Sequence, residues 1–239
     1  MAPIHLGAAT SSDIADGPPR AVLVPLGATE QHGPHLPLDT DTRIAEAWAG
    51  AMAEVVPGAV VAPTLPYGSS GEHDGFTGTL SIGQAALELT LVELGRSASH
   101  LGALLVLVSG HAGNVEPVRR AEALLTAESR AVLALFPGWP EAEGPIDAHA
   151  GWVETSLLLH LAPEAVRLDR AAAGATEPIV DLLPRLRAGG VASVAPNGVL
   201  GDPAGASAAA GADLLGDLVA RGAALITAAL TSTNPTADR

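Results

Sequence analysis

Short apolar runs alternate along the chain with longer segments in which apolar residues recur every three or four positions. The short runs predict buried strands at 21–24, 59–62, 103–108 and 131–136. The helical spacing predicts helices at 42–55, 83–101, 114–130, 157–161, 179–186 and 206–230. Because strands and helices alternate, we expect an α/β fold, a three-layer α/β/α sandwich with a mainly parallel central sheet.

Length and charge favour a single acidic domain. A chain of 239 residues suits one large α/β domain, which we expect to span residues 1–239 with a flexible tail at 231–239. The net charge of −14 argues against a nucleic-acid partner and against an anionic membrane surface. We expect no apolar stretch of membrane-spanning length, and the N-terminus lacks the pattern of a secretory signal. These features predict a soluble, cytoplasmic protein.

Missing residue types narrow the chemistry further. The chain has no cysteine, which excludes disulfides, thiolate nucleophiles and cysteine-ligated metals. Its twelve basic residues are all arginines, so a lysine Schiff base is excluded as well. Aromatic residues make up only 3% of the chain, and oligomerisation is one way in which such a chain buries more surface.

Three polar clusters follow or lie near predicted strand ends, where α/β sheets bind their ligands. The clusters consist of Glu30, His32 and Asp41, then His111 and Asn114, then His149 and Glu154, and His35 and Asp39 lie in the first loop as well. Carboxylates and imidazoles are ligands for divalent metals, and the charge of two such ions suits three carboxylates and a bridging hydroxide. The pattern favours a two-metal hydrolase, although a solvated polar loop is the alternative for the first cluster.

The same residues form ordered motifs that resemble the creatininase (creatinine amidohydrolase) family. The motifs are Glu30-Gln31-His32-Gly33-Pro34-His35-Leu36-Pro37, Asp41, Gly110-His111-x-x-Asn114, His149-Ala150-Gly151-x-x-Glu154-Thr155-Ser156 and Gly198-Val199-x-Gly201-Asp202-Pro203. The resemblance extends from about Val22 to Ala208. It is closest to the mycofactocin-system peptidases, which trim a ribosomally made precursor peptide. The runs that support this subgroup are Gly68-x-Ser70-Gly71-Glu72-His73 and Thr79-x-Ser81-Ile82-Gly83.

The resemblance implies two divalent metal ions per chain. One ion takes Glu30, Asp41 and His111, and the other takes His32, Asp41 and a further carboxylate. Creatininase has a glutamate two residues after the histidine of its Gly-His motif, where this chain has Gly113. Glu154 is the obvious substitute for that ligand. Zn, Fe and Mn all suit sites made of histidine and carboxylate.

Other residues are candidates for catalysis and substrate binding. His149 and Glu154 are the predicted catalytic residues, and a purely structural hydrogen bond is the alternative for His149. Glu72 and His73 lie in the glycine-rich stretch 64–80 and are predicted to contact substrate, with solvent exposure as the alternative. Arg43 and Trp152 complete the predicted substrate-binding set, and His35 is expected to support the ligands without binding the metals. The alternative is a helix-surface role for Arg43, packing for Trp152 and metal ligation for His35.

The sequence therefore predicts a metal-dependent amide hydrolase. By resemblance, its substrate is a modified precursor peptide of the mycofactocin system, from which it removes a short C-terminal fragment. One alternative is a creatininase-type hydrolase of a small cyclic amide or formamide. Another is a non-catalytic metal-binding or assembly subunit. The resemblance also implies a homo-oligomer, such as a hexamer.

Overall fold

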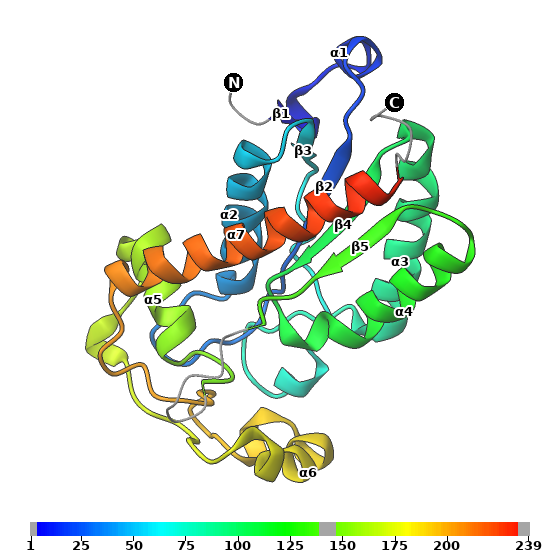
Figure 1. Cartoon of the computed structure of the whole chain (residues 1–239). Coiled ribbons are helices and arrows are strands. Elements are labelled where there is room, and N and C mark those ends of the chain that lie inside the picture. Colours follow the sequence, from blue (N-terminus) through cyan, green and yellow to red (C-terminus); the bar gives the residue numbers. More distant parts are fainter. Residues whose placement is uncertain (1–3, 139–146, 234–239) are drawn as a thin grey trace.

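The computed structural model describes residues 4–138 and 147–233 (Figure 1). The strands are β1 (Ile4–His5), β2 (Ala21–Leu26), β3 (Ala59–Val61), β4 (Leu104–Ser109) and β5 (Val132–Leu135). The α-helices are α1 (Ser11–Asp16), α2 (Thr40–Val55), α3 (Gly83–Ala98), α4 (Val115–Ala127), α5 (Trp152–Leu161), α6 (Ile179–Gly189) and α7 (Ala208–Thr233). The short 3₁₀ helices are η1 (Leu6–Ala8), η2 (Gly71–His73), η3 (Ser99–Leu101), η4 (Ala112–Asn114), η5 (Pro163–Ala165), η6 (Leu168–Arg170) and η7 (Val191–Ser193).

The strands form one sheet in the order β1-β3-β2-β4-β5, and every neighbouring pair is parallel. The centre of the sheet is β2 against β4, paired from Ala21 with Leu104 to Leu26 with Ser109. Both strands are buried along their whole length, which explains why their sequences read as continuous apolar runs. The prediction of a mainly parallel sheet is confirmed.

Alternate side chains of the central strands enter two separate cores. Leu104, Val106 and Val108 of β4 pack with α2 and α7, whereas Leu105 and Leu107 pack with α3 and α4. Helices therefore cover both faces of the sheet, and the three-layer sandwich is confirmed (Figure 1). The parallel strands also bring the loops that follow β2 and β4 to the same edge.

Two predictions about the chain ends need comment. The sequence pattern did not predict β1 or α1, since two residues are too few to establish a period and α1 buries no side chain. A capping box between Thr10 and Asp13 begins α1 instead. The predicted tail starts at residue 231, whereas α7 continues to Thr233, and residues 234–239 lie outside the described part of the chain.

The expectation that no apolar stretch reaches membrane-spanning length is wrong. Residues 208–232 of α7 form a helix that is long and apolar enough to cross a membrane, and 22% of its apolar window is buried inside the molecule. The helix nevertheless belongs to the sandwich, because Leu218 and Ile226 pack in the sheet core. In addition, Trp48 Nε1 in α2 donates a hydrogen bond to the Leu218 carbonyl oxygen at 2.9 Å.

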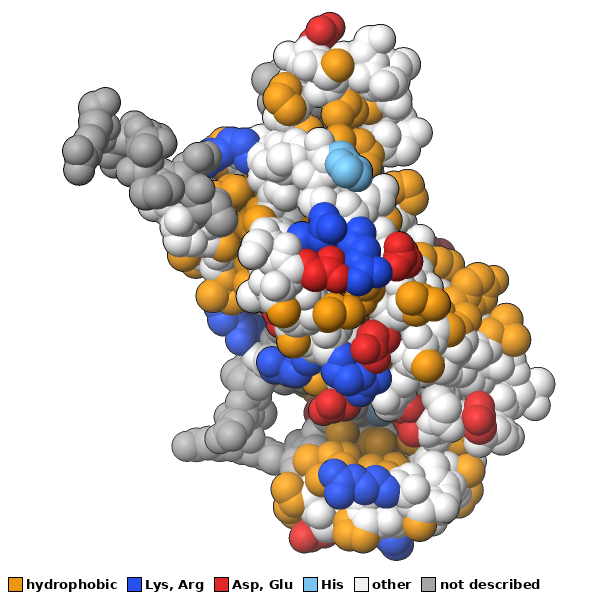
Figure 2. All heavy atoms as spheres, turned by 90° about the vertical axis from the view of Figure 1, so that its right-hand side faces the viewer, with side chains coloured by type: hydrophobic (Ala, Val, Ile, Leu, Met, Phe, Trp, Pro, Cys, Tyr) orange, Lys and Arg blue, Asp and Glu red, His pale blue; other side chains and the backbone are white. Residues whose placement is uncertain are grey.

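Helix α6 lies apart from the sandwich, below the carboxyl ends of the strands in Figure 1. A small apolar cluster of Leu182, Val191, Ala195 and Leu200 anchors it. In the space-filling view a hollow separates the α6 region from the body, and apolar side chains border this hollow (Figure 2). The strand ends and α6 therefore face each other across an opening.

Candidate metal centre

The loop after β2 brings the first polar cluster against the start of α2. Gly27 permits this approach, because a Cβ at this position would lie 2.5 Å from the Thr42 Cα. Asp41 consequently sits in the first turn of α2, where the helix dipole favours a negative charge. Asn114 joins the neighbouring loops, since its side chain accepts from Ser69 N at 2.9 Å and donates to the Gly27 carbonyl at 3.1 Å.

Carboxylates and imidazoles meet in one buried cluster at this edge. Asp41 lies between two histidines, with its Oδ1 3.1 Å from His32 Nε2 and its Oδ2 3.2 Å from His111 Nδ1. Glu30 Oε2 lies 3.2 Å from His111 Nε2. The geometry offers three groups whose possible ligand atoms lie within 4.8 Å of one another: Glu30/Asp41/His111, His32/Asp41/Glu154 and Glu30/His32/His149. The first two groups share Asp41.

The carboxylates of this cluster lack the partners that buried charges require. Neither side-chain oxygen of Glu30, nor Oδ2 of Asp41, has a hydrogen-bond partner among the described residues, although both side chains are fully or almost fully buried. A buried carboxylate is costly unless it is paired, and here its nearest neighbours are imidazole nitrogens at 3.1–3.2 Å. Cations bound among these oxygens and nitrogens would supply the positive charge instead. The residues present therefore fit a divalent metal site.

Protons and cations compete for these groups. Burial raises the pKa of Glu30 to about 8. Burial disfavours the charged form of His32, but the charge of Asp41 and its neighbours outweighs it and raises the pKa to about 10. Burial also disfavours the charged form of His111, but the negative charges of Glu30 and then Asp41 outweigh this effect and raise its pKa to about 10. Burial opposes ionisation of Asp41 too, yet the two histidines hold its pKa below the usual range. Metal binding would displace the protons from both histidines, because a ligating imidazole is neutral.

Gln31 orients two further histidines. Its side-chain amide donates to His73 Nδ1 at 2.9 Å, while His149 Nε2 donates to the Gln31 backbone carbonyl at 2.8 Å. Burial lowers the pKa of His73 to about 3 and that of His149 well below its ordinary value, so both rings are neutral near pH 7. The Gln31 carbonyl oxygen can only accept, so this contact assigns the His149 proton to Nε2. The two N–H bonds of the Gln31 amide go to His73 Nδ1 and to the Gly198 carbonyl oxygen, so its 3.0 Å approach to His149 Nε2 is not a hydrogen bond in this arrangement. The Nδ1 lone pair of His149 is then free, 3.7 Å from Glu30 Oε1 and 4.0 Å from Glu154 Oε2.

A strained turn positions Glu154 at the start of α5. Ala150 is fully buried with a φ of 54°, a conformation that is rare for residues other than glycine. Its N–H donates to Glu154 Oε2 at 2.6 Å, and the same oxygen lies 3.8 Å from His32 Nε2. His35 Nε2 is 3.0 Å from the hydroxyl of Thr155, the next residue along the helix. This position agrees with the supporting role expected for His35.

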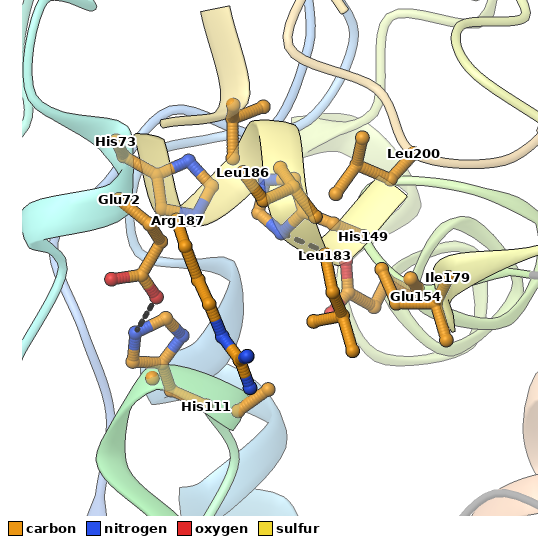
Figure 3. Close-up of a pocket in the computed structure, with 14 residues that line it drawn as sticks. Glu72, His73, His111, His149, Glu154, Ile179, Leu183, Leu186, Arg187 and Leu200 are labelled. Carbon is orange, nitrogen blue, oxygen red and sulfur yellow. Dashed lines mark ion pairs between the residues drawn. The ribbon is translucent and has the colours of Figure 1, made fainter. Parts of the chain in front are cut away.

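A cavity of about 380 Å³ opens from this cluster toward α6. His111, His149 and Glu154 line its inner side, and Glu72 and His73 of η2 line the side next to His111 (Figure 3). The opposing wall is apolar and comes from α6, η7 and the segment before α7: Ile179, Leu183, Leu186, Val191 and Leu200. The predicted catalytic residues and the two predicted loop residues therefore share one cavity.

The remaining predicted substrate residues lie elsewhere. Arg43 does not line the cavity, and its Nε donates to Asp39 Oδ1 at 2.8 Å in a pair whose two side chains are partly exposed. Trp152 also lies outside the lining, where its Nε1 donates to the Gly205 carbonyl at 3.1 Å. The arginine that lines the cavity is Arg187 of α6, which points between Glu72 and Leu183 (Figure 3).

Sequence reasoning missed Arg187, although a signal for it was present. Ile179, Leu183, Leu186 and Arg187 follow the spacing of one helix face, which is the face directed at the cavity. The Arg187 side chain makes no hydrogen bond or ion pair with any residue in the described part of the chain. An unpaired guanidinium beside a cluster of carboxylates and imidazoles is available to a ligand.

Known proteins share this fold and these motifs. The family model "Creatinine amidohydrolase" matches residues 8–226. The mycofactocin precursor peptide peptidase of Mycolicibacterium smegmatis is 52% identical over 223 residues, covering 91% of this chain and 88% of the relative. The creatinine amidohydrolase of Pseudomonas putida is 31% identical over 191 residues, covering 68% and 73%.

Solved structures agree and include metal-bound forms. A mutant creatininase of Zn-Zn type and a structure titled "Creatininase Mn" each have a TM-score of 0.77 and 30% identity, covering 94% of this chain and 97% of theirs. The family match spans most of the sequence, and its motif residues converge in one cluster with the donor set of a metal site. The chain therefore belongs to the creatininase family of amide hydrolases.

Proposed function

We propose that this protein is a metal-dependent peptidase that removes a short C-terminal fragment from the modified mycofactocin precursor peptide. The observation that carries the proposal is the 52% identity, over 91% of the chain, to a mycofactocin precursor peptide peptidase. The creatinine amidohydrolase of Pseudomonas putida is much less similar, at 31% over 68% of the chain. The peptide is therefore a better-supported substrate than a small cyclic amide.

The metal site proposed here holds two divalent ions, of which Zn and Mn are the best candidates. Glu30, Asp41 and His111 hold one ion, and His32, Asp41 and Glu154 hold the other, in agreement with the two groups that share Asp41. Bound ions of this kind polarise an amide carbonyl and make water a stronger nucleophile at neutral pH. The presence of Zn and Mn in related creatininase structures supports this choice of metals.

His149 moves the proton in the proposed reaction. Its ring is neutral, its Nδ1 lone pair is free, and it lines the cavity beside Glu30 and Glu154. Nδ1 takes a proton from the attacking water and delivers it to the leaving amide nitrogen. Glu154 lies beside this path, with its Oε2 4.0 Å from His149 Nδ1.

The wall made by α6 holds the peptide. Its apolar side chains bury the side chains of the fragment to be released, and the Arg187 guanidinium binds an acceptor oxygen of the peptide. A cavity open to solvent beside α6 lets the rest of the chain extend away from the site. This arrangement suits the end of a peptide, with the scissile amide directed at His149.

The test is direct cleavage. The purified protein, loaded with Zn²⁺ or Mn²⁺, is incubated with the modified precursor peptide, and mass spectrometry follows the products. We expect a short C-terminal fragment from the wild type, little from His149→Ala and slow turnover of creatinine. Rapid creatinine turnover without peptide cleavage would replace the peptidase proposal with the cyclic-amide alternative. No turnover of any amide would favour a non-catalytic subunit.

A further inference from the structure

Gly113 leaves a space that another residue fills. A Cβ at this position would lie 2.2 Å from Glu72 Oε1, 2.4 Å from His111 Nε2 and 2.4 Å from the Ser69 carbonyl oxygen. No side chain fits there without displacing one of these atoms. The carboxylate of Glu72 thus already occupies the place toward which a side chain at 113 would project.

The backbone around Glu72 is held in this position. Glu72 belongs to η2, and the backbone of Gly190 at the end of α6 packs against it. A Cβ on Gly190 would lie 2.7 Å from the Glu72 carbonyl oxygen, so glycine is needed for this approach too, in addition to its φ of 65°. The lack of a side chain at Gly113 leaves room for the Glu72 carboxylate, and the lack of one at Gly190 leaves room for the Glu72 backbone.

The Glu72 side chain faces the metal groups. Its Oε1 lies 3.5 Å from His111 Nε2 (Figure 3). The same nitrogen is 3.2 Å from Glu30 Oε2 and 3.1 Å from the Ser69 carbonyl oxygen. The side chain lines the cavity and is about one-third exposed, in contrast to the fully buried Glu30. The carboxylate thus closes the solvent-facing side of the Glu30/Asp41/His111 group.

Glu72 adds a fourth carboxylate to the charge of this centre. In the present side-chain arrangement it lies outside the three groups of possible ligand atoms, with its Oε1 3.5 Å from His111 Nε2. Among the described residues, Glu72 makes no ion pair with an arginine that would neutralise it. The neighbouring imidazoles offset part of the carboxylate charge when they are protonated, and two divalent cations would offset all four carboxylates. This count puts the Glu72 carboxylate in the place of the bridging hydroxide that neutralises a site with three carboxylates.

We propose that Glu72 is a metal-holding carboxylate of this centre, acting on the ion at Glu30/Asp41/His111 from the side that Gly113 leaves open. The inference rests on the proposed two-metal function. It gives Glu72 a role in metal binding, whereas the sequence predicted a contact with substrate. Glu154 holds the other ion beside His32, so the two carboxylates serve different ions.

Metal binding tests the proposal without peptide. The stripped full-length protein is titrated with Zn²⁺ or Mn²⁺ by isothermal titration calorimetry, for the wild type and for Glu72→Gln, Glu154→Gln and the double variant. We expect each single variant to weaken one of two binding events by about 10- to 100-fold, and the double variant to weaken both. Asp74→Asn is the matched control, since it neutralises an exposed carboxylate two residues away, outside the cavity lining.

The outcomes separate this proposal from the peptidase proposal. Loss of affinity for one ion in Glu72→Gln supports it, whatever the peptide assay shows. If Glu72→Gln binds both ions with wild-type affinity, the proposal is overturned, and a raised KM for peptide would then assign Glu72 to substrate. Circular dichroism of the stripped variants confirms that each is folded before the titration.

Discussion

Asp41 is the residue whose two carboxylate oxygens face histidines in different metal groups. Because Oδ1 lies beside His32 and Oδ2 beside His111, Asp41→Ala should weaken the binding of both ions and abolish hydrolysis. Asp39→Ala is the control, since Asp39 is an exposed neighbour that pairs only with Arg43 among the described residues. Metal analysis after desalting measures the outcome, and two retained ions per chain in Asp41→Ala would contradict the shared role.

Gly198 packs against the Gln31 side chain, whose Nε2 donates to the Gly198 carbonyl oxygen at 2.9 Å. A Cβ on Gly198 would lie 1.8 Å from Gln31 Oε1, and its φ is 81°. Gly198→Ala should therefore displace the side-chain amide of Gln31, which donates to His73 Nδ1, in addition to straining the backbone. We expect a loss of about 2–4 kcal/mol in the free energy of unfolding, together with a lower kcat.

Gly205 provides the control for this backbone effect. Its φ is 77°, but open space surrounds the position of an added Cβ. Gly205→Ala should cost only the left-handed conformation, about 1–2 kcal/mol, and leave kcat unchanged. Urea denaturation gives the free energies of unfolding of the two variants, and the peptide-cleavage assay gives kcat. Equal costs for the two variants would mean that the Gly198–Gln31 contact does not matter.

At the scale of elements, α6 is the part of the fold that we assign to substrate recognition. Arg187→Met removes the guanidinium but keeps most of the length and apolar surface of the side chain. We expect kcat/KM for the peptide to fall about 10- to 150-fold, the value of one charge-assisted hydrogen bond of about 1.5–3 kcal/mol. The loss should arise mainly in KM, with unchanged metal content.

Arg185→Met is the matched control on the same helix. Arg185 is exposed, does not line the cavity and makes only a long surface ion pair of 3.8 Å with Glu177 among the described residues. Such pairs contribute little, so activity should stay near the wild-type level. If Arg187→Met also behaves like the wild type, the guanidinium does not bind substrate and the apolar wall acts alone.

The elements differ in how far the sequence predicted them. The strands β2 and β4 were predictable because a strand buried on both faces must be apolar at every position. The ligand cluster was predictable as well, since parallel strands bring their following loops to one edge. Helix α6 was predicted as a helix, but its position across the cavity depends on the small cluster around Leu182, which no local pattern specifies.

The residues that line the cavity were the hardest to predict, for a physical reason. Arg43 is two residues from Asp41 in sequence, yet on a helix such neighbours point in different directions, and its side chain reaches Asp39. Arg187 is 146 residues from Asp41 in sequence and is brought to the cavity only by the fold. In the same way, the contact between Gly113 and Glu72 joins two loops whose proximity is a tertiary property.

One side of the long helix α7 is exposed in the single chain, and it carries Leu225 beside Asp213, Asp217 and Arg221. Helix α7 runs across one face of the sheet, yet only 22% of its most apolar window is buried within the chain (Figure 1). Leu225 on this helix is 52% exposed. Exposed apolar surface of this kind is a common feature of interfaces, and the net charge of −14 disfavours an anionic membrane as the surface that covers it. Copies of the same chain are the better candidate.

We therefore expect the protein to form a homo-oligomer, with α7 contributing to the interface. Sedimentation velocity at micromolar concentration should show a species several times the 23.8 kDa mass of the chain. Leu225→Glu should shift the distribution toward smaller species, because it places a charge on the apolar face of α7. Leu89→Glu on α3, at a leucine that is 62% exposed on the other side of the sheet, should leave assembly unchanged. A wild-type protein that sediments only at 23.8 kDa would reject assembly, and equal effects of the two variants would place the interface elsewhere.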